Sequence, residues 1–158
     1  AKIWDLESGK ALLTFVTFGI HSIAISPDGK YLTIGKYAET AEIWDLDSGK
    51  KVLTLNGKYN NGLAVSSVAF SPNGKLLAMG SIDGTTKIWD LESGKSIITF
   101  QDHTSPVSIV AFSPDGKRLT TWFSDVSAKI WEITPQGCVE AVGRGKRLAG
   151  LIIEQLSD

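Results

Sequence analysis

Ile88-Trp89-Asp90-Leu91-Glu92-Ser93-Gly94-Lys95 is a run of residues that this chain uses more than once. Closely similar runs begin at Ile3 and Ile43, and a shorter version, Ile130-Trp131-Glu132-Ile133, stands nearer the carboxyl terminus. The four tryptophans of these runs are separated by 40, 45 and 42 residues. Repetition at such a period is the sequence signature of an array of similar structural units.

A second marker, Ser-Pro-Asp-Gly or Ser-Pro-Asn-Gly, stands between the tryptophans at 26–29, 71–74 and 113–116. Proline and glycine favour a tight turn at these points. In the last unit the apolar run Val107–Phe112 precedes the turn, and we expect further strands at Lys117–Phe123 and Ala128–Ile133. A fourth strand follows Ser-Gly-Lys, as at Ser96–Phe100. Short strands with turn signals this close together predict an all-β fold.

Residues 1–134 resemble the WD40 repeat family, whose units carry a Trp-Asp pair. The resemblance implies four-stranded antiparallel blades arranged around a central channel as a β-propeller. In that family the outermost strand of a blade comes from the preceding sequence repeat. The chain would then hold about three blades after a leading half-blade: leading strands at 2–16, and blades at about 20–56, 64–101 and 107–142. The near-identical units resemble the recently duplicated propellers of bacteria.

About three blades is fewer than a closed propeller has, so we expect closure with missing blades or a homo-oligomer. A second copy that supplies its leading outer strand to the last blade is one arrangement. The chain opens inside a repeat without a methionine, which we expect of a piece of a larger protein.

Residues 135–158 depart from the repeat and form a carboxyl-terminal extension. Cys138–Val142 is a candidate closing strand for the last blade. Further on, Leu148, Leu151, Ile152 and Leu156 recur at helical spacing, which predicts a short helix over 147–156. Apolar spacing alone leaves open whether this helix packs on the propeller or docks a partner.

Composition excludes several classes of protein. Of 158 residues, 42% are hydrophobic and 21% charged, as in globular proteins, and the net charge of −1 gives no attraction to nucleic acid or to a membrane surface. Cys138 is the one cysteine, so the sequence offers no internal disulfide and no zinc site. We therefore expect no metal, no cofactor and a reducing, cytoplasmic location.

The resemblance also implies a buried polar network that joins a histidine, a hydroxyl, an aspartate and the repeat tryptophan. In the last blade these are His103, Thr121, Asp125 and Trp131. A hydroxyl, a histidine and a carboxylate also suggest a catalytic triad, but a triad requires an exposed nucleophile and an oxyanion hole. We interpret the set as a structural hydrogen-bond network and expect no catalytic residue.

The other blades keep less of this pattern. The second blade has Asp83 and Trp89, but Met79 stands at the hydroxyl position. The first blade has Ile34 there and Ala38 in place of the aspartate. We expect apolar packing to hold these blades, and the first blade to be the least rigid.

Positions that vary between repeats are better candidates for partner contacts than positions that recur. The loops that enter the first and third strands of each blade share one rim of a propeller. The residues we place on this rim are Phe18, His21, Tyr37, Tyr59, Asn60, Asn61, Ile82, Ser105, Trp122 and Phe123. For Trp122, which replaces a small residue of the family, filling a packing gap is an equal alternative.

These observations favour a non-catalytic scaffold or sensor module that presents its loop rim to a protein or peptide. The alternative is a structural fragment whose main property is assembly with further blades into a ring. Small-molecule binding at the channel mouth ranks third.

Overall fold

The computed structural model describes residues 1–15, 18–38, 40–57, 64–101, 104–134 and 137–140. These residues form strands and no helix, which confirms the expected all-β fold. The leading hairpin consists of β1 (Lys2–Trp4) and β2 (Ala11–Thr14). The first blade comprises β3 (Ile20–Ile25), β4 (Tyr31–Lys36), β5 (Thr40–Asp45) and β6 (Lys51–Asn56). The second comprises β7 (Val65–Phe70), β8 (Leu76–Ser81), β9 (Thr85–Asp90) and β10 (Lys95–Gln101). The third comprises β11 (Val107–Phe112), β12 (Arg118–Phe123), β13 (Ala128–Thr134) and β14 (Gly137–Glu140).

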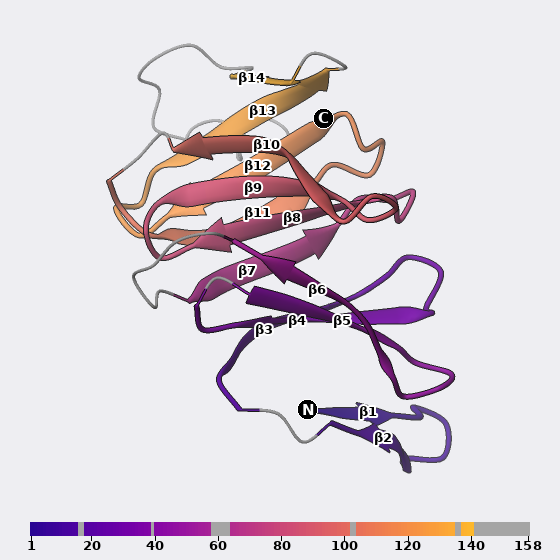
Figure 1. Ribbon diagram of the computed structural model, residues 1–158. Helices are drawn as coiled ribbons and strands as arrows, with labels where there is room; N and C mark the ends of the chain where they lie inside the picture. The colour runs from indigo at the N-terminus through magenta and orange to yellow at the C-terminus, as the bar shows by residue number, and fades with distance from the viewer. Residues whose placement is uncertain (16–17, 39, 58–63, 102–103, 135–136, 141–158) are drawn as a thin grey trace, which may run out of the picture.

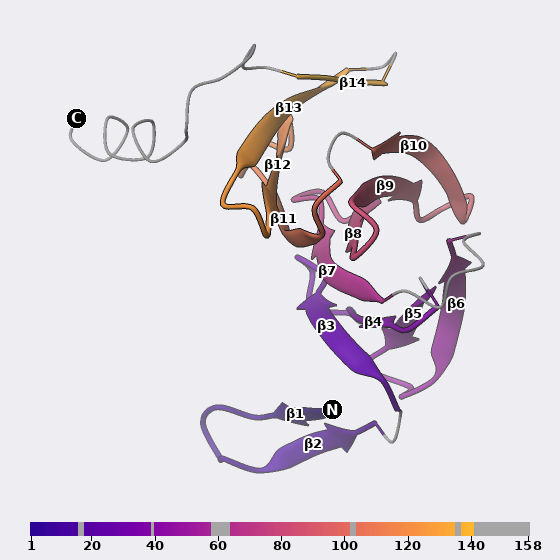
Figure 2. The same ribbon diagram turned by 90° about the vertical axis from the view of Figure 1, so that its left-hand side faces the viewer.

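Each blade is an antiparallel sheet whose strands pair in chain order, and β3, β7 and β11 lie side by side as the inner strands (Figures 1 and 2). The outer strand of the third blade, β14, comes from the chain itself. The expectation that a second copy supplies this strand is therefore wrong, because its place is already taken. The predicted helix over 147–156 lies outside the described residues.

The two turn motifs close by recurring side-chain hydrogen bonds. The serine bond of the Ser-Pro-Asp-Gly or Ser-Pro-Asn-Gly turn occurs in all three blades, and the Asp–Ser bond after the tryptophan occurs in the leading hairpin and the first two blades. In the first blade the Ser26 hydroxyl donates to Asp28 Oδ1 at 2.6 Å and accepts from the backbone N–H of Tyr31 at 2.9 Å. Asp45 Oδ1 accepts from both the hydroxyl and the N–H of Ser48, at 2.6 and 2.7 Å. The bond from the Ser48 hydroxyl is the main reason that the pKa of Asp45 is lowered.

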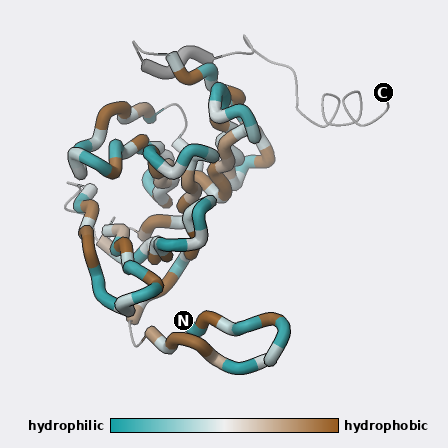
Figure 3. Tube along the Cα trace, turned by 90° about the vertical axis from the view of Figure 1, so that its right-hand side faces the viewer, coloured by the Kyte–Doolittle hydropathy of each residue, from teal (hydrophilic) through white to brown (hydrophobic). Residues whose placement is uncertain are grey.

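The core lies between the blades rather than within one of them. Figure 3 shows hydrophobic residues along the strands of every blade. The middle strands β4, β8 and β9 are buried almost throughout, because successive side chains point to opposite faces of the sheet and both faces of these strands pack against other parts of the chain. We call the face toward the preceding unit the front face and the face toward the following unit the rear face. The repeat tryptophans lie on front faces, where Trp44 meets Phe15 and Trp131 meets Phe100. Trp89 packs in the cluster that contains Leu55, which stands in the first blade where Phe100 stands in the second.

The same hydrogen bond occurs at the interface of the first blade with the second and at the interface of the second with the third. The hydroxyl of Ser22, on the first blade, accepts the backbone N–H of Val68 at 3.0 Å. The equivalent Ser67, on the second blade, accepts the N–H of Val110 at 3.1 Å. An inner-strand serine thus fastens each of these blades to the inner strand of the next.

Glycines paired with these two serines in the sheet register let neighbouring blades approach closely. A Cβ atom built on Gly35 would lie 2.9 Å from Val65 Cγ1, and one on Gly80 would lie 2.5 Å from Val107 Cγ1. Both distances are too short for a real side chain, so these positions require glycine. Each glycine therefore forms a small pit that receives a valine of the following blade.

Candidate partner-binding rim

The turns that enter β3, β5, β9 and β13 lie at one end of the blades, on the left in Figure 1. This rim exposes large apolar side chains. Phe18 is 88% exposed, Val126 is 76% exposed and Tyr37 is 57% exposed, and Ile82 is also exposed. Among the described residues of the opposite turns, Leu6 is a comparable exposed apolar side chain.

An aromatic cluster at the first blade gives this rim a defined shape. The rings of His21 and Tyr37 meet edge to face, with centroids 4.3 Å apart. Tyr37 also lies over Gly19, where a Cβ atom would be 2.7 Å from its ring. The hydroxyl of Thr40 donates to the Tyr37 carbonyl at 3.0 Å and fixes the turn. Phe18 adjoins Gly19, so its exposed ring stands next to a surface held in place by packing.

His21 owes its exposure to a bulge at the start of β3. The pairing of β3 with β4 shifts between Ile20 and Ser22, which leaves His21 as the extra residue. A bulge redirects the side chain that it contains. The second blade has the same shift, but its extra residue Ser66 donates hydrogen bonds to the carbonyls of Gly80 and Val107. Histidine therefore replaces a blade-to-blade contact with an exposed ring.

Val126 is the second unusual feature of the rim. Its φ of 67° lies in the left-handed region, where the second blade has Gly84 at the equivalent position. A β-branched residue is strained there. At this turn between β12 and β13, Val126 presents an apolar side chain that is exposed.

Two predicted rim residues belong elsewhere. Phe123 is 1% exposed and packs in the core between the second and third blades, so its assignment to the rim is wrong. Trp122 lies inside β12 opposite Ile109, on the rear face of the sheet rather than in a rim loop. Ser105 is half-buried beside β11. Tyr59, Asn60 and Asn61 lie outside the described residues.

The expected polar network is present in part. Trp131 Nε1 donates to the Thr121 hydroxyl at 3.0 Å within the third blade. Asp125 accepts the backbone N–H of Ser127 at 2.9 Å, and in the second blade Asp83 accepts that of Thr85 at 2.8 Å. His103 lies outside the described residues.

The equivalent indole N–H groups of the first and second blades have no hydrogen-bond acceptor among the described residues. Trp44 Nε1 and Trp89 Nε1 are buried and make no hydrogen bond. Ile34 and Met79 occupy the position of Thr121, and neither offers an oxygen to the indole. The same replacements that the sequence showed thus leave two buried donors unsatisfied.

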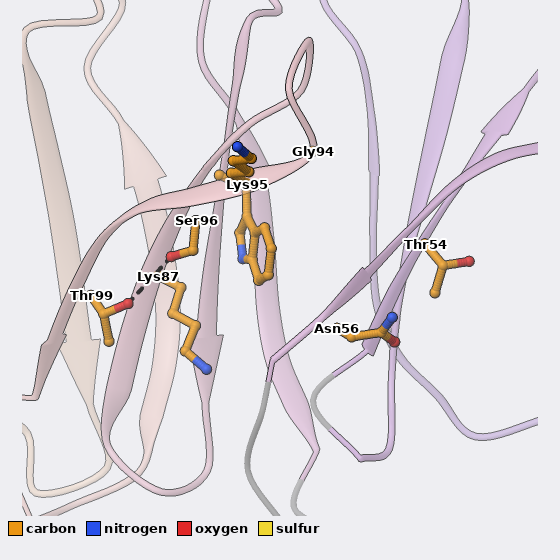
Figure 4. A pocket seen from close by; sticks show the side chains of 8 residues that line it. Thr54, Asn56, Lys87, Gly94, Lys95, Ser96 and Thr99 are labelled. Carbon is orange, nitrogen blue, oxygen red and sulfur yellow. Dashed lines mark hydrogen bonds between the residues drawn. The ribbon is translucent and has the colours of Figure 1, made fainter.

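A cavity of about 700 Å³ opens between the first and second blades. In Figure 4, Thr54 and Asn56 lie on one wall, and Lys87, Ser96 and Thr99 on the facing wall. The cavity adjoins the outer strands β6 and β10 rather than a channel mouth, the place that the third-ranked alternative gives to small-molecule binding.

Two features are absent from the described part of the chain. It contains no group of three or more His, Cys, Asp or Glu side chains placed to hold a metal ion. It also contains no helix long and apolar enough to cross a membrane.

Comparison with protein families agrees with this architecture. The model of the WD domain, G-beta repeat, matches residues 9–45, 49–90 and 94–132, which together make up most of the chain. The chain belongs to the WD40 family. Repeats of this family generally mediate protein–protein interactions, and the family is typically non-enzymatic. No curated protein matches the chain as a relative.

Proposed function

We propose that this WD40 chain is a non-catalytic interaction module whose rim binds a protein or peptide through Phe18, His21 and Tyr37. Ile82 and Val126 extend the same apolar rim toward the second and third blades. The observation that carries the proposal is the exposure of Phe18 and Tyr37 beside a cluster fixed by ring packing and a hydrogen bond.

Exposed aromatic side chains on a rigid support suit this role. Burying one phenylalanine contributes about 1.5–3 kcal/mol, and aromatic residues are enriched among the residues that dominate binding. Tyr37 is already held by Thr40, His21 and Gly19, so it loses little freedom when a partner binds. A loop rim presented by strands also tolerates side chains that serve binding rather than packing.

A random-peptide library selected on the full chain tests the proposal. Selected peptides are expected to lose at least about tenfold in affinity for Phe18→Ser and for Tyr37→Ser, since each change removes about 1.4 kcal/mol or more of apolar contact. Leu6→Ser, at the opposite turns, is the matched control because it removes an equally exposed apolar side chain. Peptides that bind both rim variants as tightly as the original chain, or that depend on Leu6, would refute the proposed site.

One observation favours the second candidate, assembly with further blades, at the leading side. Ile23 in β3 is 54% exposed, whereas its equivalents Val68 and Val110 are buried against the preceding blades. β1 is also an edge strand with one partner, β2. Unpaired edges and uncovered faces promote association. The absolute mass of the chain in solution tests this candidate, and a monomer at all concentrations would count against self-association.

A further inference from the structure

The rear face of the third blade departs from the interface used by the other two blades. In the first blade the rear face presents Ser22 and Gly35, and in the second it presents Ser67 and Gly80. The equivalent pair in the third blade is Ile109 and Trp122, which lie opposite each other in the register of β11 and β12. Two small residues that receive a neighbouring blade are thus replaced by two large apolar ones.

These replacements prevent a further blade from docking in the same way. At Gly80 even a single Cβ atom would clash with the valine of the following blade. Trp122 stands at the equivalent position, and its indole is far larger than a single Cβ atom. Ile109 has no hydroxyl to accept the N–H that Ser22 and Ser67 accept. A second copy that added its first blade here would meet the same obstruction, because it would bring the same type of inner strand.

The face is nevertheless apolar and uncovered. Ile109 is 56% exposed, although the serines at its position form contacts between blades. Ile130 is partly exposed, whereas its equivalents Ile43 and Ile88 are 4% and 0% exposed. Ala128 lies next to Trp122 in the register of β12 and β13 and extends the apolar row. Exposed apolar rows of this kind mark contact surfaces.

We propose that residues 147–156 of this chain cover the rear face of the third blade. The segment carries Leu148, Leu151, Ile152 and Leu156, and these four apolar residues suit a face made of Ile109, Trp122 and Ile130. It follows β14, the outer strand of the same blade, so it begins beside the surface that it would cover.

The connecting residues are long enough for this placement. Residues 141–146 can span about 20 Å when extended. The distance from β14 across the sheet to β11 is three strand spacings, or about 14 Å. The proposal is independent of the rim, which lies at the ends of the strands rather than on the face of the sheet.

Disulfide trapping in the full chain tests the placement. In a Cys138→Ser background, Ile109→Cys would be combined in turn with Leu148→Cys, Leu151→Cys and Ile152→Cys. Oxidised glutathione at low protein concentration is expected to give an intrachain disulfide in at least one pair. Ile25→Cys, at an exposed position on β3, is the control and is expected to form none with the same partners. Interchain disulfides alone would assign the face to a second copy, and that result or no disulfide would overturn the proposal.

A second measurement does not require cysteines. The indole N–H of Trp122, assigned in a nitrogen–proton spectrum with Trp122→Phe, is expected to shift in Leu151→Ser/Ile152→Ser. The Trp131 indole, which is hydrogen-bonded to Thr121 in the same blade, is expected to stay in place. An unchanged Trp122 signal would contradict the proposed contact.

Discussion

The third blade and the second blade present the same tryptophan in two different environments. Trp131 donates to Thr121 and lies against Phe100, with ring centroids 4.3 Å apart. Trp89 has Met79 in place of the hydroxyl and packs in the same cluster as Leu55. One blade therefore combines a polar bond with close packing of two rings, whereas the tryptophan of the other lacks the bond and packs in a mainly aliphatic cluster. The shared strand pattern is sufficient for the fold, and the side chains around the tryptophan set local stability.

One residue beside the tryptophan also distinguishes the interface between the first and second blades. Leu55 occupies the position that Phe15 and Phe100 occupy in the neighbouring units. A leucine is smaller than a phenylalanine and has no ring to pack against the indole of Trp89.

Removal of the Thr121 hydroxyl is expected to lower the free energy of unfolding more than any other substitution proposed here. Thr121→Val keeps the side-chain shape but leaves the buried Trp131 Nε1 without an acceptor, so it should lower the free energy of unfolding by about 1–3 kcal/mol. The matched change in the second blade, Met79→Leu, conserves volume and should cost less than about 1.5 kcal/mol. Urea denaturation measures both. Equal losses would mean that the Thr121–Trp131 bond adds nothing to the third blade.

Substitutions at the strained turn of Val126 and at its counterpart Gly84 should change the free energy of unfolding by the next largest amount. Gly84→Val places a β-branched residue at a φ of 85° and should cost about 1–2 kcal/mol. Val126→Gly relieves the same strain and should raise the free energy of unfolding, although the freedom of glycine in the unfolded chain offsets part of this gain. If Val126→Gly raises stability but weakens peptide binding, the strained turn serves the rim. If it lowers stability, Val126 supports the fold instead.

Hydrogen exchange should distinguish the first blade from the third. The first blade lacks the indole–hydroxyl bond and exposes its inner strand at Ile23. A difference of about 1 kcal/mol corresponds to about fivefold faster amide exchange in β4 and β5 than in β12 and β13. Slower amide exchange in β4 and β5 than in β12 and β13 would contradict the conclusion that the first blade is the less stable one.

The ion pairs of the first blade should make the smallest contribution. Glu42 contacts Lys36 at 3.4 Å and Lys51 at 3.2 Å. Burial raises the pKa of Glu42, but the bond from Lys51 and the charge of Lys36 outweigh it and hold the pKa below its ordinary value. Glu42→Gln should therefore cost at most about 1 kcal/mol at neutral pH.

The pH dependence of the free energy of unfolding provides a control for Glu42→Gln. A carboxylate with a lowered pKa stabilises the fold above its unfolded pKa of about 4.5 and loses that contribution as the pH falls through the lowered value. The difference between Glu42→Gln and the original chain should shrink below pH 4.5 and be constant above about pH 6. A difference that persists at low pH would show that packing, rather than charge, is responsible.

The repeated features of the sequence predicted the repeated features of the structure. The Ser-Pro-Asp-Gly and Trp-Asp runs predicted the blades, and Met79 and Ile34 at the position of Thr121 predicted that the first two blades keep less of the polar network. Phe123 was misplaced because strand alternation decides whether a residue near a strand end faces the core or the rim. The glycine pits and the cavity depend on distances between blades, and a single sequence does not contain those distances.

Trp122 shows how sequence and structure complement each other. The sequence marked it as a large residue at a position where a small one is usual, but left its role open. The register shows why size matters there, because the equivalent Gly80 receives Val107 of the following blade.

Photo-cross-linking from the rim is the most direct test of the proposed interaction module. Benzoylphenylalanine would replace Phe18 on the rim and, in a separate chain, Leu6 at the opposite turns, and each full chain would be irradiated in an extract of the cells that produce it. Mass spectrometry is expected to find a specific protein joined to position 18 and absent from position 6, with the yield reduced by Tyr37→Ser. Equal labelling from both positions, or a specific partner at position 6 alone, would contradict a binding site on this rim.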